Sequence, residues 1–226
     1  METLKKHIDE SLFSNKPMDT GELSNKIELQ YLKDHIHIFS AGTYLNYNDR
    51  LEFEIDNDNE LIIKSKSSLL LYMYVLAFRG DLSSFPCKIK QIQLEKFKIH
   101  FEHCQGLKNF KDIFSVNYRP WGDVDELEVL DCPEFESFEG WPKIQEVSYL
   151  YLPETPLKSY KGIPRVYNEI IGGNDNWCIN KDHRHSFGVE ACLDDIDMVY
   201  NALPKCPVKN YINRELRAYY AKVQSS

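Results

Sequence analysis

Apolar and polar residues alternate with two different periods along the chain, and the changes of period separate helical from extended segments. Leu4, Ile8 and Leu12 recur every four residues, which predicts a short amphipathic helix. A second helix is predicted from about Thr20, a suitable N-cap residue. The period then becomes two, and apolar positions at residues 51–55 and 61–63 flank a run of Asp and Asn. This pattern predicts a β-hairpin.

Helical periodicity returns after residue 180. The residues Val189, Leu193, Ile196, Tyr200 and Leu203 fall on one face of a predicted helix that ends before a proline. A second helix is predicted from about residue 208, with apolar residues on one face and basic residues on the other. Together the two helices would cover the apolar end of the segment that precedes them in the chain.

The middle of the chain is an irregular repeat. Four segments begin with an apolar anchor and place an aromatic residue three positions later, and the anchors lie 25, 28 and 22 residues apart. The four anchors are Leu82, Leu107, Phe135 and Leu157. Each is preceded by a short alternating stretch typical of a strand. One strand in every 20 to 29 residues predicts a solenoid, because a single unit cannot bury its apolar face alone.

The last two repeats read FESFEGWP and LKSYKGIP, and they share Ser, Gly and Pro at the same positions. With the residues that follow them, they resemble the irregular leucine-rich-repeat-like proteins of bacteria and phages. The resemblance covers residues 74–175 and departs from the family at Asp131 and Pro153, where an Asn is usual. It implies a solenoid whose strand-bearing face binds other molecules.

The predicted fold class is therefore α/β: a short open leucine-rich-repeat-like solenoid with an α/β N-terminal cap and a helical C-terminal cap. The expected parts are residues 1–66 for the N-terminal cap, 67–180 for the solenoid and 181–226 for the two-helix cap. The 28-residue repeat is longer than its neighbours, so residues 115–124 are expected to form an ejected loop.

Composition excludes several classes of protein. The chain has 226 residues, 42% of them hydrophobic, which is enough for a core without disulfide or metal support. It has no apolar run of membrane-spanning length and no signal-peptide pattern at its N-terminus, so a cytoplasmic location is expected, in the host cytoplasm if a phage encodes it. The 35 acidic residues outnumber the 27 basic ones, which disfavours general nucleic-acid binding.

The acidic charge is concentrated between residues 123 and 139, where eight carboxylates occur without a Lys or Arg. Alternation with Leu127 and Val129 predicts that Glu126 and Glu128 face outward from the strand ladder. Such a stretch needs either water or a basic partner. It can be read as a docking face for a protein with a basic surface, or as a solvated face with no binding role.

Aromatic residues supply the other predicted contacts. Tyr118, Arg119 and Trp121 lie in the expected loop and are residue types enriched at interface hot spots. Tyr149 and Tyr151 belong to a later repeat and could extend the same surface. Alternatively, Trp121 folds back over the edge of the solenoid.

Other groupings point to different chemistry. Basic and tyrosine residues interleave on the C-terminal helix, which gives an alternative function in nucleic-acid association. Cys178, His183 and His185 form a Cys/His cluster without a fourth ligand, so metal binding and an enzyme built on this cluster are minor alternatives. The run that starts at Asp56 begins like a calcium loop but lacks its Gly and its closing Glu.

No catalytic or cofactor-binding motif is present in the sequence. The sequence therefore predicts a non-catalytic protein-protein interaction module without cofactor or metal. If the phage resemblance holds, its role would be to modulate or inhibit a host protein. The predicted contact residues are Tyr118, Arg119, Trp121, Glu126, Glu128, Tyr149 and Tyr151.

Overall fold

The structure is a computed structural model that describes residues 20–40, 45–66, 74–153, 157–172, 178–180 and 193–223. The helices are α2 (Thr20–His35), α3 (Leu193–Ala202) and α4 (Pro207–Val223), with a 3-10 turn η1 (Asn48–Arg50). The strands are β1 (Ile36–Ser40), β2 (Leu51–Ile55), β3 (Glu60–Ser65), β4 (Tyr74–Asp81), β5 (Lys88–Gln93), β6 (Lys96–Gln105), β7 (Phe114–Arg119), β8 (Asp123–Leu130), β9 (Glu146–Tyr151), β10 (Arg165–Ile171) and β11 (Cys178–Asn180). The described chain is thus mostly β-strand with few helices.

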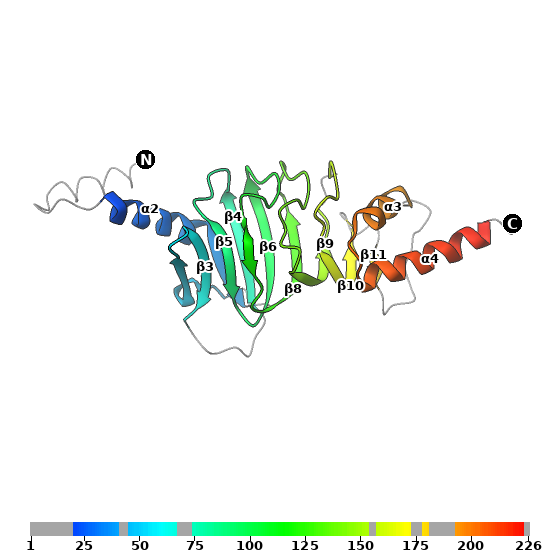
Figure 1. Cartoon of the computed structure of the whole chain (residues 1–226), viewed down its shortest axis with the longest axis horizontal. Helices are drawn as coiled ribbons and strands as arrows, with labels where there is room; N and C mark the ends of the chain where they lie inside the picture. Colours follow the sequence, from blue (N-terminus) through cyan, green and yellow to red (C-terminus); the bar gives the residue numbers. More distant parts are fainter. Residues whose placement is uncertain are drawn as a thin grey trace, which may run out of the picture.

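These strands form a β-solenoid of about four turns. Sheet A has seven strands in the order β1-β4-β6-β8-β9-β10-β11, and sheet B has four in the order β2-β3-β5-β7. From β4 to β8 the chain passes alternately through the two sheets, so each turn adds one strand to each. Figure 1 shows the strands stacked side by side along the long axis of the molecule. The solenoid predicted from the repeats is confirmed.

The parallel ladder of sheet A keeps one inward position in line through every turn. Tyr74 pairs with Phe97, Phe97 with Val124, Val124 with Val147 and Val147 with Val166. All five side chains are buried. Bulges interrupt the ladder in each of these pairings except β8 with β9, so the outward positions follow a less regular register.

Antiparallel strands and helices close both ends of sheet A. β1 runs antiparallel to β4, and β11 runs antiparallel to β10. Helix α2 packs against β1 and β4, whereas α4 packs against β10 and β11 (Figure 1). The helices thus lie at the two ends of sheet A, where a sheet would otherwise offer unpaired backbone groups. The predicted hairpin is confirmed as β2 and β3, and the predicted helices are confirmed in α2, α3 and α4.

The repeat anchors build the core between the sheets. Leu82, Leu107 and Phe135 are buried, and Leu157 is partly buried against the same core. Aromatic rings link successive turns, and Phe110 contacts the rings of both the preceding and the following turn. The expected first helix lies outside the described residues, as do residues 181–192 before α3. The sequence predicted the hairpin that forms part of sheet B, but it did not predict the other two strands of this sheet, β5 and β7, whose pairing is interrupted by bulges.

Candidate functional site

The outer face of sheet A brings four of the predicted contact residues together in two cross-turn rows. Glu126 pairs with Tyr149, and Glu128 pairs with Tyr151, in the parallel ladder of β8 and β9. On the other side of β8, Glu126 pairs with Lys98 of β6 and Glu128 pairs with His100. The prediction that Glu126 and Glu128 face away from the core is confirmed.

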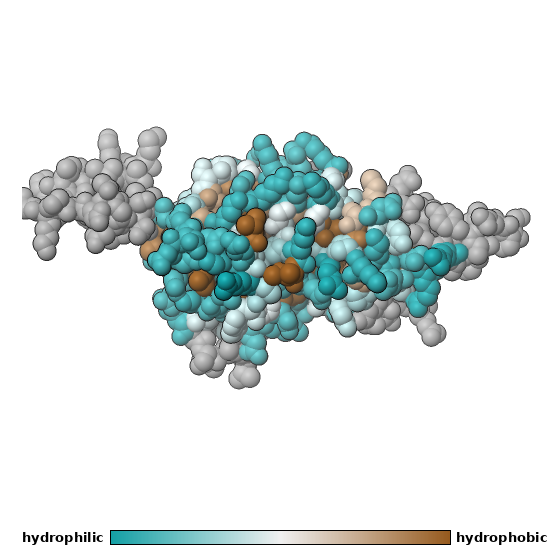
Figure 2. All heavy atoms as spheres, viewed as in Figure 1, coloured by the Kyte–Doolittle hydropathy of each residue, from teal (hydrophilic) through white to brown (hydrophobic). Residues whose placement is uncertain are grey.

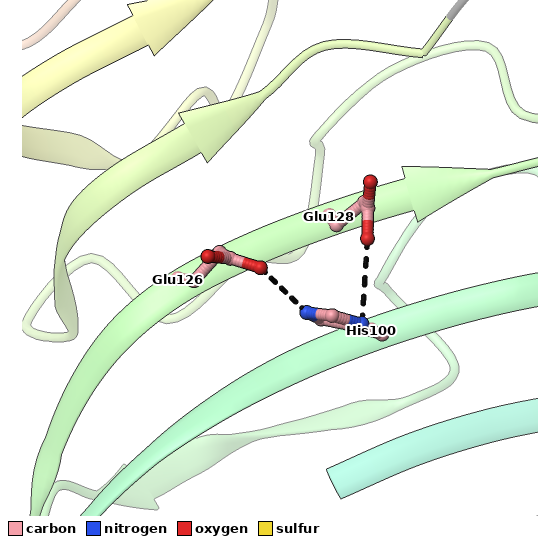
Figure 3. A group of neighbouring side chains, drawn as sticks. All are labelled: His100, Glu126 and Glu128. Atoms are coloured by element: carbon pink, nitrogen blue, oxygen red, sulfur yellow. Dashed lines mark hydrogen bonds and ion pairs between the residues drawn. The ribbon is translucent and has the colours of Figure 1, made fainter. Parts of the chain in front are cut away.

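His100 is the centre of a charge network on this face. Its Nε2 lies 2.8 Å from a carboxylate oxygen of Glu126, and its Nδ1 lies 3.3 Å from oxygens of both Glu102 and Glu128. Figure 3 shows the ring lying between Glu126 and Glu128, with one nitrogen directed at each. An imidazole can satisfy carboxylates on both sides only when both nitrogens carry a proton. The geometry therefore matches an imidazolium.

Two further cations balance the carboxylates. Lys98 forms an ion pair with Glu126, and Arg79 of β4 forms one with Glu102 through Nε and a guanidinium Nη. The guanidinium also lies 4.8 Å from the ring centroid of Phe39 on β1. With His100 protonated, three cations face three carboxylates. The net charge of these six side chains is therefore close to zero.

The pKa values follow from this arrangement. Burial works against the protonated form of His100, but its hydrogen bonds to Glu102 and Glu126 and the nearby charge of Glu128 outweigh it and raise the pKa to about 9. The bond from His100 lowers the pKa of Glu102 to about 2, with Arg79 assisting. For Glu126, the bonds from His100 and Lys98 overcome burial and lower its pKa. Burial raises the pKa of Glu128.

This network predicts a pH-dependent stability. Because the folded-state pKa of His100 is raised, its contribution is fully present below about pH 6.5 and is lost as pH rises through about 9. The loss should amount to at most about 3 kcal/mol, the free-energy equivalent of the shift. It can be measured as the free energy of unfolding in urea at intervals between pH 6 and pH 10, the interval that brackets this titration.

The matched control is His100→Gln, which cannot titrate but can still hydrogen-bond. It should be less stable than the parent below pH 7 and should lack the decline between about pH 7 and 9. An identical decline in the variant would show that His100 is not its source.

His100, Glu126 and Glu128 could in principle supply three ligands to a metal ion, since one ligand atom from each lies within 4.8 Å of the others. However, the two carboxylates contact opposite nitrogens of the ring, and only one nitrogen can face a shared ion. A divalent ion would also have to displace the imidazolium proton and compete with Lys98 for Glu126. The arrangement favours a proton in this position over a metal.

A second cluster, made of three carboxylates, also holds a cation of the chain itself in place of a metal ion. Asp56, Asp58 and Glu60 converge in the β2–β3 hairpin, but Lys90 of β5 lies 2.5, 3.4 and 3.2 Å from their carboxylates. The hydrogen bond that Lys90 donates to Asp56 is the main reason why the pKa of Lys90 is raised. A lysine ammonium thus occupies the position that a calcium ion would need.

Most of the acidic stretch at residues 123–139 is neutralised in this way by neighbouring turns. Asp125 pairs with Lys96, Asp131 with His103, Glu136 with Lys158, and Glu139 with Lys111 and Lys161. Glu134 accepts a hydrogen bond from the backbone of Gly106. The stretch therefore finds its basic partner largely within the chain, so its charge alone does not indicate a docking face for an external basic protein.

The expected loop at residues 115–124 is wrong in extent. Most of it belongs to β7 and β8, but a bulge does begin at residue 115: Ile89 pairs with Phe114 and Gln91 with Arg119, leaving four residues of β7 opposite one residue of β5. The hydroxyl of Ser115 accepts a hydrogen bond from the Asn117 backbone and stabilises the bulge.

The three contact residues predicted in this loop have different positions. Tyr118 is only 5% exposed, and its hydroxyl donates to the side chain of Gln145, so its ring is unavailable to a partner. Burial raises its pKa. Arg119 is exposed at the end of β7, and Trp121 is 53% exposed in the turn before β8. Trp121 therefore does not fold back as a plug.

The buried residues of β9 are Val147 and Leu150, whereas Tyr149 and Tyr151, which the sequence analysis predicts as contact residues, are only partly buried. The sequence missed Lys98 and His100, which neutralise the glutamates. Aligning Ile99 with Leu127 through the repeat would have placed both opposite the acidic stretch.

The C-terminal basic residues are partly engaged within the fold. Lys209 of α4 donates to the backbone oxygen of Leu203 at the end of α3 and lies 4.9 Å from the centroid of the Tyr200 ring. The guanidinium of Arg214 lies over the ring of Tyr211. Residues 183 and 185 of the Cys/His cluster lie outside the described residues.

No protein-family model, curated protein or solved structure matches the chain. Among the described helices, none has the length and apolar character required to cross a membrane. The functional proposal therefore rests on the residues and their geometry.

Proposed function

We propose that the chain is a non-catalytic protein-binding module that presents the outer face of sheet A to its partner. The observation that carries this proposal is the register that sets Tyr149 and Tyr151 beside Glu126 and Glu128 in adjacent strands. Neighbouring strands lie about 4.8 Å apart, so the two tyrosines and Glu128 form a closely spaced surface on rigid backbone, beside Glu126, which is itself only 8% exposed. Such a surface loses little entropy on binding.

The tyrosines are expected to supply most of the binding energy. A tyrosine offers a large contact area and a hydrogen-bonding hydroxyl while fixing only two side-chain angles. Glu126 and Glu128 are already paired with Lys98 and His100, so a partner gains less from their charge than an exposed acidic patch would provide. We therefore propose a partner that stacks against the tyrosines and hydrogen-bonds to the network, without requiring a strongly basic surface.

The resemblance of the repeats to irregular leucine-rich-repeat-like proteins extends the proposal. A phage-encoded module of this kind would modulate or inhibit a host protein in the host cytoplasm. The β-solenoid supports the binding role only in general terms, since stacked turns present extended surfaces to partners.

The test is quantitative capture from a bacterial lysate with the purified chain, followed by an affinity measurement with each partner identified. The double variant Tyr149→Ala with Tyr151→Ala should bind such a partner at least about tenfold more weakly than the parent. The matched control Met198→Ala removes an exposed side chain on α3 and should bind like the parent. Equal affinity of the parent and the tyrosine variant would contradict the proposed surface.

A further inference from the structure

Exposed apolar side chains gather on a second surface, at the open edge of sheet B. Six large apolar side chains are exposed among the described residues, and three of them belong to β7, the turn after it, and the segment beside it. Val116 is 97% exposed, Trp121 is 53% exposed and Ile144 is 60% exposed. Figure 2 shows one face of the molecule, which is largely hydrophilic with a few hydrophobic groups over the middle of the solenoid.

The fold brings these residues together from two turns. Sheet B ends at β7, whereas sheet A continues with β8, β9, β10 and β11. Beside β7 the chain runs through residues 141–145 without forming a strand. Gln145 joins the two segments: its side chain accepts from the hydroxyl of Tyr118 and donates to the backbone oxygen of Gly122. Ile144 precedes Gln145 in the chain and Trp121 precedes Gly122, so both lie where the two segments meet.

The bulge explains why Val116 protrudes. Phe114 and Tyr118 at its two ends are buried, and Phe114 packs its ring 5.2 Å from that of Trp141. Four residues, 115–118, face one residue of β5; Ser115 and Tyr118 of these are buried, whereas Val116 and Asn117 between them are exposed. The bulge is thus anchored at both ends by core contacts, and its apolar tip lies in solvent. No core requirement accounts for a valine at this tip.

Two cations on this surface have no carboxylate partner in the described part of the chain. Arg119 and Lys143 are exposed and form no ion pair with any described residue, whereas most carboxylates of the acidic stretch are paired. The acidic neighbours are Asp123, exposed two residues after Trp121, and the exposed Glu95, whose backbone oxygen accepts a hydrogen bond from the Asp123 backbone. We name Val116, Arg119, Trp121, Lys143 and Ile144 the β7 patch. It combines exposed apolar area with two uncompensated positive charges in a chain of net charge −8.

We propose that the β7 patch is a docking surface for an acidic segment of a partner protein that also carries apolar side chains. Charge complementarity selects the acidic partner, because Arg119 and Lys143 have no counter-ion among the described residues. Tryptophan and arginine are the residue types that most often dominate binding energy. Burial of Trp121, Val116 and Ile144 against apolar side chains would supply the affinity, and the cations would supply orientation and charge selectivity. This surface is separate from the tyrosine rows on sheet A and does not depend on them.

The test uses two short fluorescein-labelled peptides of equal length, one alternating Glu with Leu and the other alternating Lys with Leu. Fluorescence anisotropy of the full chain with each peptide should show binding of the Glu peptide, weakened by added salt, and at least about tenfold weaker binding of the Lys peptide. Absence of binding to the Glu peptide, or equal binding of the two peptides, would overturn the proposal.

Variants then assign the binding to the patch. Arg119→Glu with Lys143→Glu should weaken binding of the Glu peptide at least about tenfold, as should Trp121→Ala. The matched control Asp123→Asn removes the neighbouring negative charge, so it should bind at least as tightly as the parent. The variant Tyr149→Ala with Tyr151→Ala should also bind like the parent, so failure of the sheet A surface leaves this result unaffected. Thermal unfolding of each variant checks that the fold is retained.

Tryptophan emission gives an independent measurement. In a Trp177→Phe background, Trp141 is buried and Trp121 is the exposed indole, so the Glu peptide should protect the emission from acrylamide quenching. Unchanged quenching would contradict docking at Trp121. Sedimentation of the free protein tests the other occupant: a dimer that Arg119→Glu with Lys143→Glu dissociates would assign the patch to a second copy of the chain and overturn the proposal.

Discussion

Replacing Phe110 with alanine is expected to lower the free energy of unfolding by about 3 to 5 kcal/mol. Phe110 is fully buried and its ring lies 4.9 Å from that of Phe101 in the preceding turn and 5.2 Å from that of Phe135 in the next. Its backbone also bonds to Glu139 of the next turn. The truncation would leave a cavity between rigidly stacked turns, where the surroundings can collapse only partly. Urea unfolding followed by circular dichroism measures the loss.

Two controls separate this effect from a general sensitivity to truncation. Phe110→Leu keeps most of the volume and should lose clearly less than the alanine variant. Met198→Ala removes an exposed side chain and should change the stability by less than about 0.5 kcal/mol. A loss below about 1 kcal/mol for Phe110→Ala would show that the turns do not share one continuous core.

Gly140→Ala is expected to cost about 2 to 4 kcal/mol, although it adds a single methyl group. Gly140 has a φ of +96°, a region that L side chains rarely adopt. A Cβ there would also lie 2.2 Å from the backbone nitrogen of Lys111 and 2.4 Å from the carbonyl carbon of Phe110. Both contacts are with the backbone of the preceding turn, which cannot move without separating the turns. Thermal and urea unfolding measure the cost.

Gly80→Ala is the matched control, because it shares the strained backbone without the clash. Its φ is +84°, but the nearest atom to a Cβ is in the side chain of His35, at 3.1 Å. It should therefore cost only about 1 kcal/mol, from the backbone conformation. Equal losses for the two variants would mean that the close approach of the turns at Gly140 contributes nothing.

Several carboxylates of the acidic stretch are paired with lysines of neighbouring turns. Asp125, Glu126 and Glu139 are each matched by a lysine of a neighbouring turn. Such pairs favour one register of stacked turns over others. The cations Arg119 and Lys143, by contrast, have no carboxylate partner among the described residues.

Features encoded by local sequence were predictable. The hairpin turn at Asp56 follows from its Asx residues, because Asp56 accepts the backbone hydrogen bonds of Asp58 and Glu60 in the folded turn. Gly140 and the aromatic anchors followed from the repeat, because each turn must place a small residue and a large ring at the same point. The C-terminal helix α4 followed from its amphipathic period.

Features that depend on register between turns were not predictable in the same way. Alternation alone did not determine which residues of β9 face the core, because an alternating strand reads equally well in both phases. The bulge at residue 115 was anticipated as a longer loop, because the repeat length shows an excess of residues without showing where sheet B takes them up.

By itself, the sequence determined that this protein is a solenoid closed by helices. Repeat spacing and apolar period are properties of each single turn, so they can be recognised without knowing how neighbouring turns pack. Only the tertiary structure decided which charges are free. Lys98 and Glu126 are 28 residues apart and meet because parallel strands align them, whereas Arg119 and Lys143 meet no carboxylate among the described residues. The ion pairs and the exposed surfaces are properties of the stacking, and stacking depends on bulges and registers that a single turn does not encode.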